Sequence, residues 1–392
     1  MKKLKICMIS KYPPHKGGTS SLNYWLSRGL GELGHKVHVV TDPSETGGNY
    51  LKNLDAEQMS GYEPRNVRMH SAERISVTNV KSRISFLVST ALEVMEENDI
   101  DLIDTKYFIP YGVAGFFLKL IKSKPLVTRH GGSDIAYLLK DPSYRMLLIR
   151  MLKNSDKIIL DPSHFEGIKS LGVEEKRMII SSDFAINARS VDGAKTKSFL
   201  KKAGIDGSLP IIGCFGKMSG GKGLVELLSS LSKIKDEDFL LLLVPESENE
   251  MIKSQVSRFG LERKTKVLDY QPPWLMPYLY DSLTALIATE VDFPVKAHTP
   301  LTAYEAFAFG KCTIISEETR NKPQFRNISD GVNAVVVDPK DTAGYAKKLK
   351  WLIKNPHEAE SIGINAKSTV SPDREVIVKK LAEIYMKAAE GG

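Results

Sequence analysis

The chain has 392 residues, of which 42% are hydrophobic and 26% charged, and its formal net charge is +8. At roughly 150 residues per domain, this length predicts two or three domains of ordinary globular composition. The longest apolar runs, such as Phe239–Val244, fall far short of the roughly 20 residues that cross a bilayer. The basic opening contains only the short apolar segment Ile6–Ile9. We therefore expect neither a membrane span nor a signal peptide.

Cysteine usage and charge narrow the class further. Cys7, Cys214 and Cys312 each lie inside an apolar run without metal-ligand spacing, which predicts buried free thiols and a reducing, cytoplasmic compartment. The positive charge suits phosphate-bearing substrates or anionic lipid. The sequence has no zinc-ligand spacing, and we expect no nucleic-acid partner.

Short β-rich runs alternate with helical patterns along the first half of the chain. The predicted strands are Leu4–Ser10, Lys36–Thr41, Val67–His70, Leu102–Tyr107, Leu126–His130, Lys157–Asp161 and Met178–Ser182. The predicted helices between them are Thr19–Leu33, Arg83–Asn98 and Tyr111–Lys122. This alternation is typical of βαβ units, so residues 1–190 are expected to form a doubly wound α/β domain with a mostly parallel sheet.

A polar segment over 185–209 marks the domain boundary, and the alternation then restarts. The predicted strands are Ile211–Phe215, Phe239–Val244, Lys266–Tyr270, Leu283–Thr289, Thr313–Ser316 and Ala334–Val337. The predicted helices are Leu224–Ile234, Glu248–Phe259, Leu301–Phe309, Thr342–Ile353, His357–Lys367 and Arg374–Ala389. We expect a second doubly wound domain over 191–370, facing the first across a cleft. A C-terminal helix over 371–392 is expected to pack back on the first domain.

The stretch Ile211–Leu228, IIGCFGKMSGGKGLVELL, reads as strand, glycine loop and helix. Loop N–H groups together with Lys217 and Lys222 suit a diphosphate. The spacing matches a P-loop as far as Lys222, but Gly223 stands where a P-loop needs Ser or Thr to hold Mg²⁺. A P-loop-like nucleotide hydrolase and a plain strand-to-helix turn with solvated lysines both stay open here.

Two loops of the first half could meet a ligand, because ligands of parallel sheets bind beyond the carboxyl ends of the strands. His130, in VTRHGGSD, ends a predicted strand and could contact a substrate hydroxyl or carbonyl; the alternative is a histidine satisfied by backbone. Asp42 resembles a ribose-binding acid. However, the loop Lys11–Ser20 keeps only Gly17 and Gly18 of the dinucleotide fingerprint, so we do not expect a dehydrogenase.

The segment HTPLTAYEAFAFG predicts a helix with Thr299 as N-cap and Pro300 at the first helical position. The free N–H groups at its start would make a second anion site. Glu305 lies about a turn and a half into this helix, where its carboxylate could accept both hydroxyls of a ribose. The alternative for Glu305 is a solvated or salt-bridged helix residue.

Four segments in this order resemble the retaining GT-B glycosyltransferases of glycosyltransferase family 4, the group 1 glycosyltransferases. They are KICMISKYPPHKGGTSSLNYWLSRGLGELGHKVHVVT, VTRHGGSD, GCFGKMSGGKGLVELL and PLTAYEAFAFGKCTIIS. The resemblance implies two facing Rossmann-like domains. A nucleoside diphosphate sugar would be held mainly by the second domain and the acceptor by the first, with no metal or other cofactor required.

Carried over by position, the resemblance assigns site residues. It implies His130, Lys217 and Lys222 as catalytic residues, with His130 on the donor sugar and the lysines on the diphosphate. It implies Gly17, Gly18, Lys217, Lys222 and Glu305 as donor-binding residues, the last on the ribose. The free N–H groups at the helix start add Thr299, Leu301 and Thr302 to the predicted donor site. Lys217 replaces the arginine usual in the family, which loses the bidentate fork. Ala297 replaces the first of two paired glutamates, so Lys296 or His298 could contact the sugar instead.

The expected function is therefore retaining, hexosyltransferase-type sugar transfer to the hydroxyl of a saccharide, lipid-linked or small-molecule acceptor. Two alternatives stay open besides the hydrolase: a GT-B sugar-nucleotide epimerase, and a non-catalytic nucleotide-sugar binder, because of Ala297. The segment 105–133 contains no acidic residue and combines basic with aromatic side chains. This composition suits peripheral contact with an anionic membrane. These side chains are Lys106, Lys119, Lys122, Lys124, Arg129, Phe108, Phe116 and Phe117. The alternative is that the phenylalanines pack on the sheet.

Overall fold

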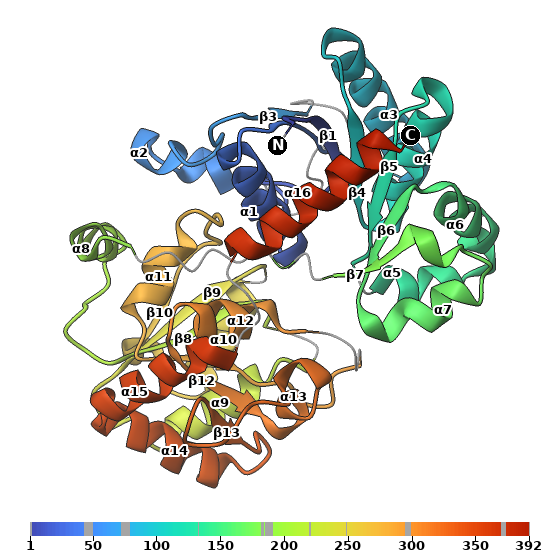
Figure 1. Cartoon of the computed structure of the whole chain (residues 1–392). Coiled ribbons are helices and arrows are strands. Elements are labelled where there is room, and N and C mark those ends of the chain that lie inside the picture. Colours follow the sequence, from blue (N-terminus) through green and yellow to red (C-terminus); the bar gives the residue numbers. More distant parts are fainter. Residues whose placement is uncertain are drawn as a thin grey trace. The chain divides into compact units, whose positions relative to one another are not determined.

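The structure is a computed structural model that describes residues 2–42, 50–71, 79–131, 133–181, 184, 191–218, 221–247, 249–294, 299–369 and 374–391. The chain divides into two compact units (Figure 1). The first comprises Met1–His15, Thr19–Ala185 and Arg374–Gly392, and the second comprises Lys16–Gly18 and Ile186–Asp373. The last change of unit along the chain falls between residues 373 and 374, three residues beyond the expected end of the second domain.

The described part of the first unit contains a seven-stranded parallel sheet in the order β3-β2-β1-β4-β5-β6-β7. Its strands are β1 Lys5–Ile9, β2 Lys36–Val40, β3 Val67–His70, β4 Leu102–Lys106, β5 Leu126–Arg129, β6 Lys157–Leu160 and β7 Met178–Ile180. In register, Ile6 stands between Val37 of β2 and Leu102 of β4. The central strands β1, β4 and β5 are buried almost throughout, as expected where helices cover both faces of a parallel sheet.

The helices of the first unit are α1 Gly18–Glu32, α2 Ala56–Met59, α3 Val80–Glu97, α4 Val113–Lys122, α5 Ser133–Ala136, α6 Pro142–Asn154, α7 Phe165–Lys169 and α16 Arg374–Glu390. Shorter turns are 3-10 helices at Tyr50–Asn53, Leu138–Lys140, Pro162–His164 and Glu175–Arg177, and a π-type turn at Phe108–Gly112. One core joins α3, α4 and α6 to the sheet through residues such as Leu87, Leu118 and Leu148. Figure 1 shows α16 lying along the sheet, against β4 and β5.

A buried polar network attaches α16 to this sheet. The guanidinium of Arg129 binds both carboxylate oxygens of Asp104, with Nε–Oδ1 2.9 Å and NH2–Oδ2 2.6 Å. The hydroxyl of Tyr385 on α16 donates to Asp104 Oδ1 at 2.8 Å. At the start of the same helix, Arg374 pairs with Glu32 of α1 at 2.7 Å. Arg129 is therefore a buried structural residue.

The expected basic and aromatic surface over 105–133 does not form as a single exposed patch. Lys106, Phe108, Phe116 and Arg129 are all buried, so these four side chains are not part of a membrane-facing surface. Phe108 and Phe116 pack in the core instead, which is the alternative that the sequence left open. Lys106 and Arg129 belong to the sheet, Phe116 lies on the buried face of α4, and Phe108 lies in the turn before α4. The exposed part of α4 carries Phe117, Leu120 and Ile121. Lys119 and Lys122 pair there with Asp156 and Glu96, and Lys124 lies near Asp99.

The described part of the second unit contains a six-stranded parallel sheet in the order β10-β9-β8-β11-β12-β13. Its strands are β8 Ile211–Gly216, β9 Leu240–Pro245, β10 Thr265–Val267, β11 Ala285–Ala288, β12 Cys312–Ser316 and β13 Val335–Val337. Its helices are α8 Gly193–Lys202, α9 Leu224–Ser232, α10 Asn249–Arg258, α11 Met276–Ser282, α12 Leu301–Ala308, α13 Glu317–Arg320, α14 Thr342–Lys354 and α15 Pro356–Ala366. Its 3-10 helices are Glu262–Lys264, Pro323–Phe325 and Lys367–Thr369.

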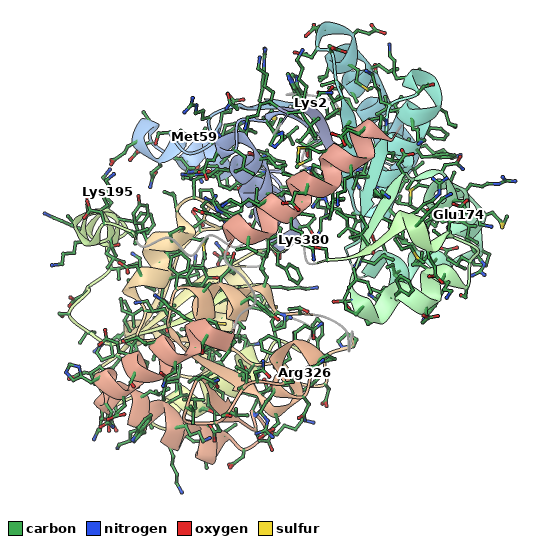
Figure 2. The ribbon with its side chains drawn as sticks, viewed as in Figure 1. Lys2, Met59, Glu174, Lys195, Arg326 and Lys380 are labelled. Atoms are coloured by element: carbon green, nitrogen blue, oxygen red, sulfur yellow. The ribbon has the colours of Figure 1, made fainter. Side chains whose placement is uncertain are left out.

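Packing in the second unit follows the same principle. Helices α9 and α14 pack together over the sheet, with Leu227, Leu243 and Leu349 in one buried cluster. In Figure 2, charged side chains such as Lys195 of α8 project outward from the ribbon. The prediction of two tandem doubly wound α/β units is confirmed. Cys7, Cys214 and Cys312 are buried free thiols, as predicted, and burial raises the pKa of each to about 12. Among the helices in the described ranges, none is long and apolar enough to cross a membrane.

Candidate functional site

The sheet of the second unit reverses its strand order at β8, which pairs with β9 on one side and β11 on the other. In open parallel sheets this switch point leaves a crevice beyond the carboxyl ends of the two strands, and ligands bind there. The loops after β8 and β11 flank that crevice. Lys217 and Lys222 lie in the first loop, and Glu290 and Phe293 in the second.

The two loops pack closely against each other through glycines. Gly221 has φ +85°, and a Cβ there would lie 2.7 Å from the carbonyl oxygen of Val291. Gly223 precedes α9 with φ +68°, and a Cβ there would lie 2.6 Å from Thr289 Oγ1. Position 223 therefore has no room for the Ser or Thr of a P-loop, and this geometry argues against the hydrolase alternative.

Lys222 points into a charged cluster at the end of β11. Its Nζ lies 2.5 Å from Glu290 Oε1 and 3.9 Å from the centre of the Phe293 ring. The other oxygen of Glu290 accepts from Lys322, which follows α13. Burial lowers the pKa of Lys222 below its ordinary value, and the carboxylate of Glu290 opposes that shift. Lys217 follows Gly216 at the end of β8 and is exposed.

Helix α12 begins beside the end of β8. A Cβ on Gly216 would lie 3.8 Å from the side-chain methyl of Thr302, and Leu301 and Thr302 open the helix half-buried. The expected cap was wrong by one residue, because Pro300 is the N-cap, with φ −69° and ψ 103°, and Thr299 lies outside the helix. Proline has no side-chain acceptor, so no side chain caps this end. Its first-turn N–H groups face the same edge as Gly216.

Glu305 is buried in α12, and its charge is supported by a tyrosine. The hydroxyl of Tyr280, on α11, donates to Glu305 Oε2 at 2.5 Å. The ring of Tyr280 stacks on Phe309 with centroids 5.3 Å apart. Burial, and next the charge of Glu305, raise the pKa of Tyr280 well above its ordinary value, so the hydroxyl keeps its proton. The structure therefore differs from the alternative of a solvated or salt-bridged helix residue, because Glu305 is buried and its partner is a tyrosine of α11.

The segment Lys16–Gly18 groups with the second unit. The N–H of Gly17 donates to the hydroxyl of Tyr270 at 3.0 Å. Gly18 begins α1, and a Cβ there would lie 3.2 Å from Leu301. Both glycines therefore allow close approach of the backbone to the side chains of this unit.

His130 follows β5 in the first unit, as predicted. Its Nε2 accepts from the backbone N–H of Asp161 at 3.0 Å, and its ring meets His164 edge-to-face at 5.0 Å. An accepting Nε2 fixes the neutral tautomer with the proton on Nδ1. Nearby, Asp134 binds the N–H groups of Gly131 and Phe108 and has its pKa raised to about 6 by burial.

A second charged cluster lies at the carboxyl end of β2, where the sequence had singled out Asp42 but none of its partners. The Asp42 carboxylate accepts from Tyr111 at 2.6 Å and from Arg83 at 2.5 Å, with His15 Nε2 3.3 Å away. Burial alone would raise the pKa of Asp42, but these contacts outweigh burial and hold the pKa well below its ordinary value. The only sequence signal was an acidic residue directly after a strand.

Three positions that the resemblance singled out, Lys296, Ala297 and His298, lie outside the described residues. Within the described ranges, no group of three or more His, Cys, Asp or Glu side chains could hold a metal ion.

Two doubly wound units in tandem, with a cationic glycine loop at the switch point of the second, define the GT-B class of glycosyltransferase fold. The chain belongs to the group 1, family 4 glycosyltransferases. The family model described as "Glycosyl transferases group 1" matches residues 195–369, and "Glycosyltransferase Family 4" matches residues 16–165. The family named from the sequence is thereby confirmed.

Individual relatives are distant. The chain is 24% identical to N-acetyl-alpha-D-glucosaminyl L-malate synthase of Bacillus anthracis, over 98% of this chain and 97% of that protein. HepE of Anabaena, solved in complex with UDP-glucose, superimposes with a TM-score of 0.68 at 16% identity, covering 98% and 100% of the two chains. Sucrose-phosphate synthase from Thermosynechococcus elongatus superimposes with a TM-score of 0.69 at 16% identity, covering 99% and 100%. At these identities the solved structures establish the fold alone.

Proposed function

We propose that this glycosyltransferase moves a hexose from a nucleoside diphosphate sugar to an acceptor hydroxyl, with retention at the anomeric carbon and without a metal. One observation carries the proposal: Lys222 is anchored at the switch point of the second unit, beside the glycine loop. That arrangement suits the diphosphate of a donor. The UDP-glucose bound to HepE and the glucosaminyl group in the name of the Bacillus anthracis relative agree with this donor class.

In the proposed reaction, the bond between the anomeric carbon and the diphosphate breaks, and negative charge grows on the leaving group. Lys217, Lys222 and the first-turn N–H groups of α12 stabilise that charge, because fixed cations and dipoles need no reorganisation as it develops. The bond from the same anomeric carbon to the acceptor oxygen forms on the face that the leaving group vacates. The leaving phosphate takes the proton of the acceptor hydroxyl.

The remaining residues hold the donor. Glu305, oriented by Tyr280, binds the ribose hydroxyls, and Gly17 and Gly18 lie beside the phosphates. His130 contacts the donor sugar, the role that the resemblance implies for it. Thr299, Leu301 and Thr302 form the turn whose backbone faces the diphosphate.

The acceptor is a saccharide, a lipid-linked molecule or a small molecule such as the malate named for the Bacillus anthracis relative. Exposed Phe117, Leu120 and Ile121 on α4 support peripheral contact with an anionic membrane. Three apolar side chains at spacings of three and one form one strip on a helix, which suits insertion at a lipid interface.

The test is a binding and product experiment. UDP, ADP, GDP and CDP are titrated into the protein by calorimetry, and the sugar form of the best nucleotide is then supplied with and without candidate acceptors. We expect Mg²⁺-independent binding of one nucleotide, and an α-linked product from an α-linked donor by NMR. An inverted product would contradict retention. An isomerised sugar with donor alone would indicate the epimerase, and Mg²⁺-dependent release of phosphate from ATP or GTP would indicate the hydrolase.

A further inference from the structure

Glu290 is an acidic residue in a site that should attract anions. It follows β11, its side chain is only 1% exposed, and its N–H donates to Ser316 Oγ at 3.1 Å, which fixes the backbone there. One carboxylate oxygen binds Lys222 at 2.5 Å, and the other binds Lys322. The residue thus joins the loop after β8 to the segment after α13.

The two lysines that share Glu290 are themselves largely enclosed. The side chain of Lys222 is 15% exposed and that of Lys322 is 5% exposed. The ring of Phe293 lies beside both ammonium groups, 3.9 Å from Lys222 Nζ and 5.6 Å from Lys322 Nζ. Buried charges are tolerated only when they are paired, and two like charges this close to one ring repel each other. The shared carboxylate offsets both costs.

We infer that Glu290 is a positioning residue for the lysine that binds the donor diphosphate. One carboxylate oxygen binds Lys222 and the other binds Lys322, which fixes both the position and the positive charge of Lys222. This inference rests on the proposed role of Lys222. Glu290 acts through Lys222 and does not touch the donor. In the empty site it supplies the negative charge that the diphosphate supplies in the complex.

The neighbours of Lys222 shift its pKa in opposite directions. Burial lowers the pKa of Lys222, Glu290 raises it, and the positive charges of Lys322 and Lys217 lower it. The buried thiol of Cys214, on β8, also faces this ammonium group, but burial raises its pKa to about 12, so it stays neutral from pH 6 to pH 10. Only the protonated lysine attracts a diphosphate, so the alkaline limit of diphosphate binding reports on this balance.

Removing the charge of Glu290 and removing that of Lys322 should therefore shift the alkaline limit of binding in opposite directions. In Glu290→Gln the amide keeps the shape without the charge, so Lys222 loses its proton at lower pH and binding fails earlier. In Lys322→Met the repulsion between the two ammonium groups disappears and Glu290 pairs with Lys222 alone. Lys222 then keeps its proton, and binding persists, to higher pH. An opposite charge within hydrogen-bond distance typically moves a pKa by about one to three units, and we expect shifts of about one pH unit each way.

The experiment measures UDP binding by calorimetry from pH 6 to pH 10, with inorganic pyrophosphate as a second probe that reports on the diphosphate alone. The variants are Glu290→Gln, Lys322→Met and Lys222→Ala. The matched controls are Glu250→Gln and Lys253→Met, which break an exposed Lys–Glu pair of 2.8 Å on α10. Circular dichroism and thermal melting confirm that each variant is folded.

We expect the pH of half-maximal binding to fall in Glu290→Gln, to rise in Lys322→Met and to stay unchanged in both controls. Unchanged midpoints in the two variants, or shifts in the same direction, would overturn the inference. If Glu290→Gln does not fold, an unchanged or lowered midpoint in Lys322→Met still overturns it. A failure of the proposed function would give a different result: Lys222→Ala would bind UDP and pyrophosphate as tightly as the wild type does.

Discussion

Tyr280→Phe tests whether the buried glutamate of α12 is held ready for a ribose. The substitution removes one hydroxyl and keeps the ring, which stacks on Phe309 at 5.3 Å and meets Phe215 edge-to-face at 5.4 Å. The lost hydrogen bond is the 2.5 Å contact to Glu305 Oε2. A hydrogen bond to a charged group contributes about 1.5–3 kcal/mol, so we expect the free energy of unfolding to fall by about that amount.

The same change should weaken recognition of the ribose. A carboxylate that has lost its orienting donor is no longer preorganised, and one factor of ten in affinity corresponds to about 1.4 kcal/mol. The assay compares the dissociation constants of UDP and 2′-deoxy-UDP for wild type and variant. We expect the wild type to prefer UDP by about tenfold and the variant to lose most of that preference.

Tyr278→Phe is the matched control, because Tyr278 lies on the same helix and stacks on Phe199. It should leave the preference for UDP unchanged. If Tyr280→Phe discriminates between the two nucleotides as strongly as the wild type, then Glu305 is not the ribose ligand or Tyr280 does not orient it.

Three further predictions concern the glycine loop, the first unit and the membrane. Gly223→Ala should lower the free energy of unfolding by about 1–3 kcal/mol more than Gly260→Ala. Both positions have φ near +65°, but only position 223 would place a Cβ against Thr289. Equal losses in urea unfolding would refute the packing argument. Asp42→Asn should destabilise the protein at neutral pH, and its difference from the wild type in free energy of unfolding should shrink as the pH falls below about 4. The reason is that a carboxylate whose pKa is depressed on folding contributes stability above its unfolded pKa and loses it on protonation. A difference that is constant from pH 7 to pH 3 would contradict this. A variant with Phe117, Leu120 and Ile121 changed to Ser should lose sedimentation with phosphatidylserine vesicles, and a wild type that does not sediment with them at low salt would remove the membrane proposal.

Strand and helix periodicity in the sequence was enough to predict the two doubly wound units, because both sheets are parallel and buried on both faces. Runs such as Leu241–Val244 are then apolar throughout, and the loops that separate them are polar. The glycine loop and Glu305 were also visible, since a strand that ends in glycines and a glutamate within an apolar helix are both local signals.

The contacts that hold the site were not visible, because they join residues far apart in the chain. Lys222 meets Glu290 across 68 positions, and Tyr280 meets Glu305 across 25. Nothing in the local sequence of Glu290 distinguishes a buried ion-pair partner from a solvated loop residue. The same reason explains why Arg129 was expected at a basic surface, although the structure pairs it with Asp104 inside the sheet.

The central claim is that a lysine anchored at the switch point of the second unit drives departure of the donor diphosphate. The most direct measurement is the turnover number of Lys222→Ala with the best nucleotide sugar, beside wild type and Lys253→Met. Removing one preorganised cation from a transition state costs about 10²–10³ in rate, so we predict a loss of that size with an unchanged circular dichroism spectrum. Turnover within a few-fold of the wild type would contradict the claim.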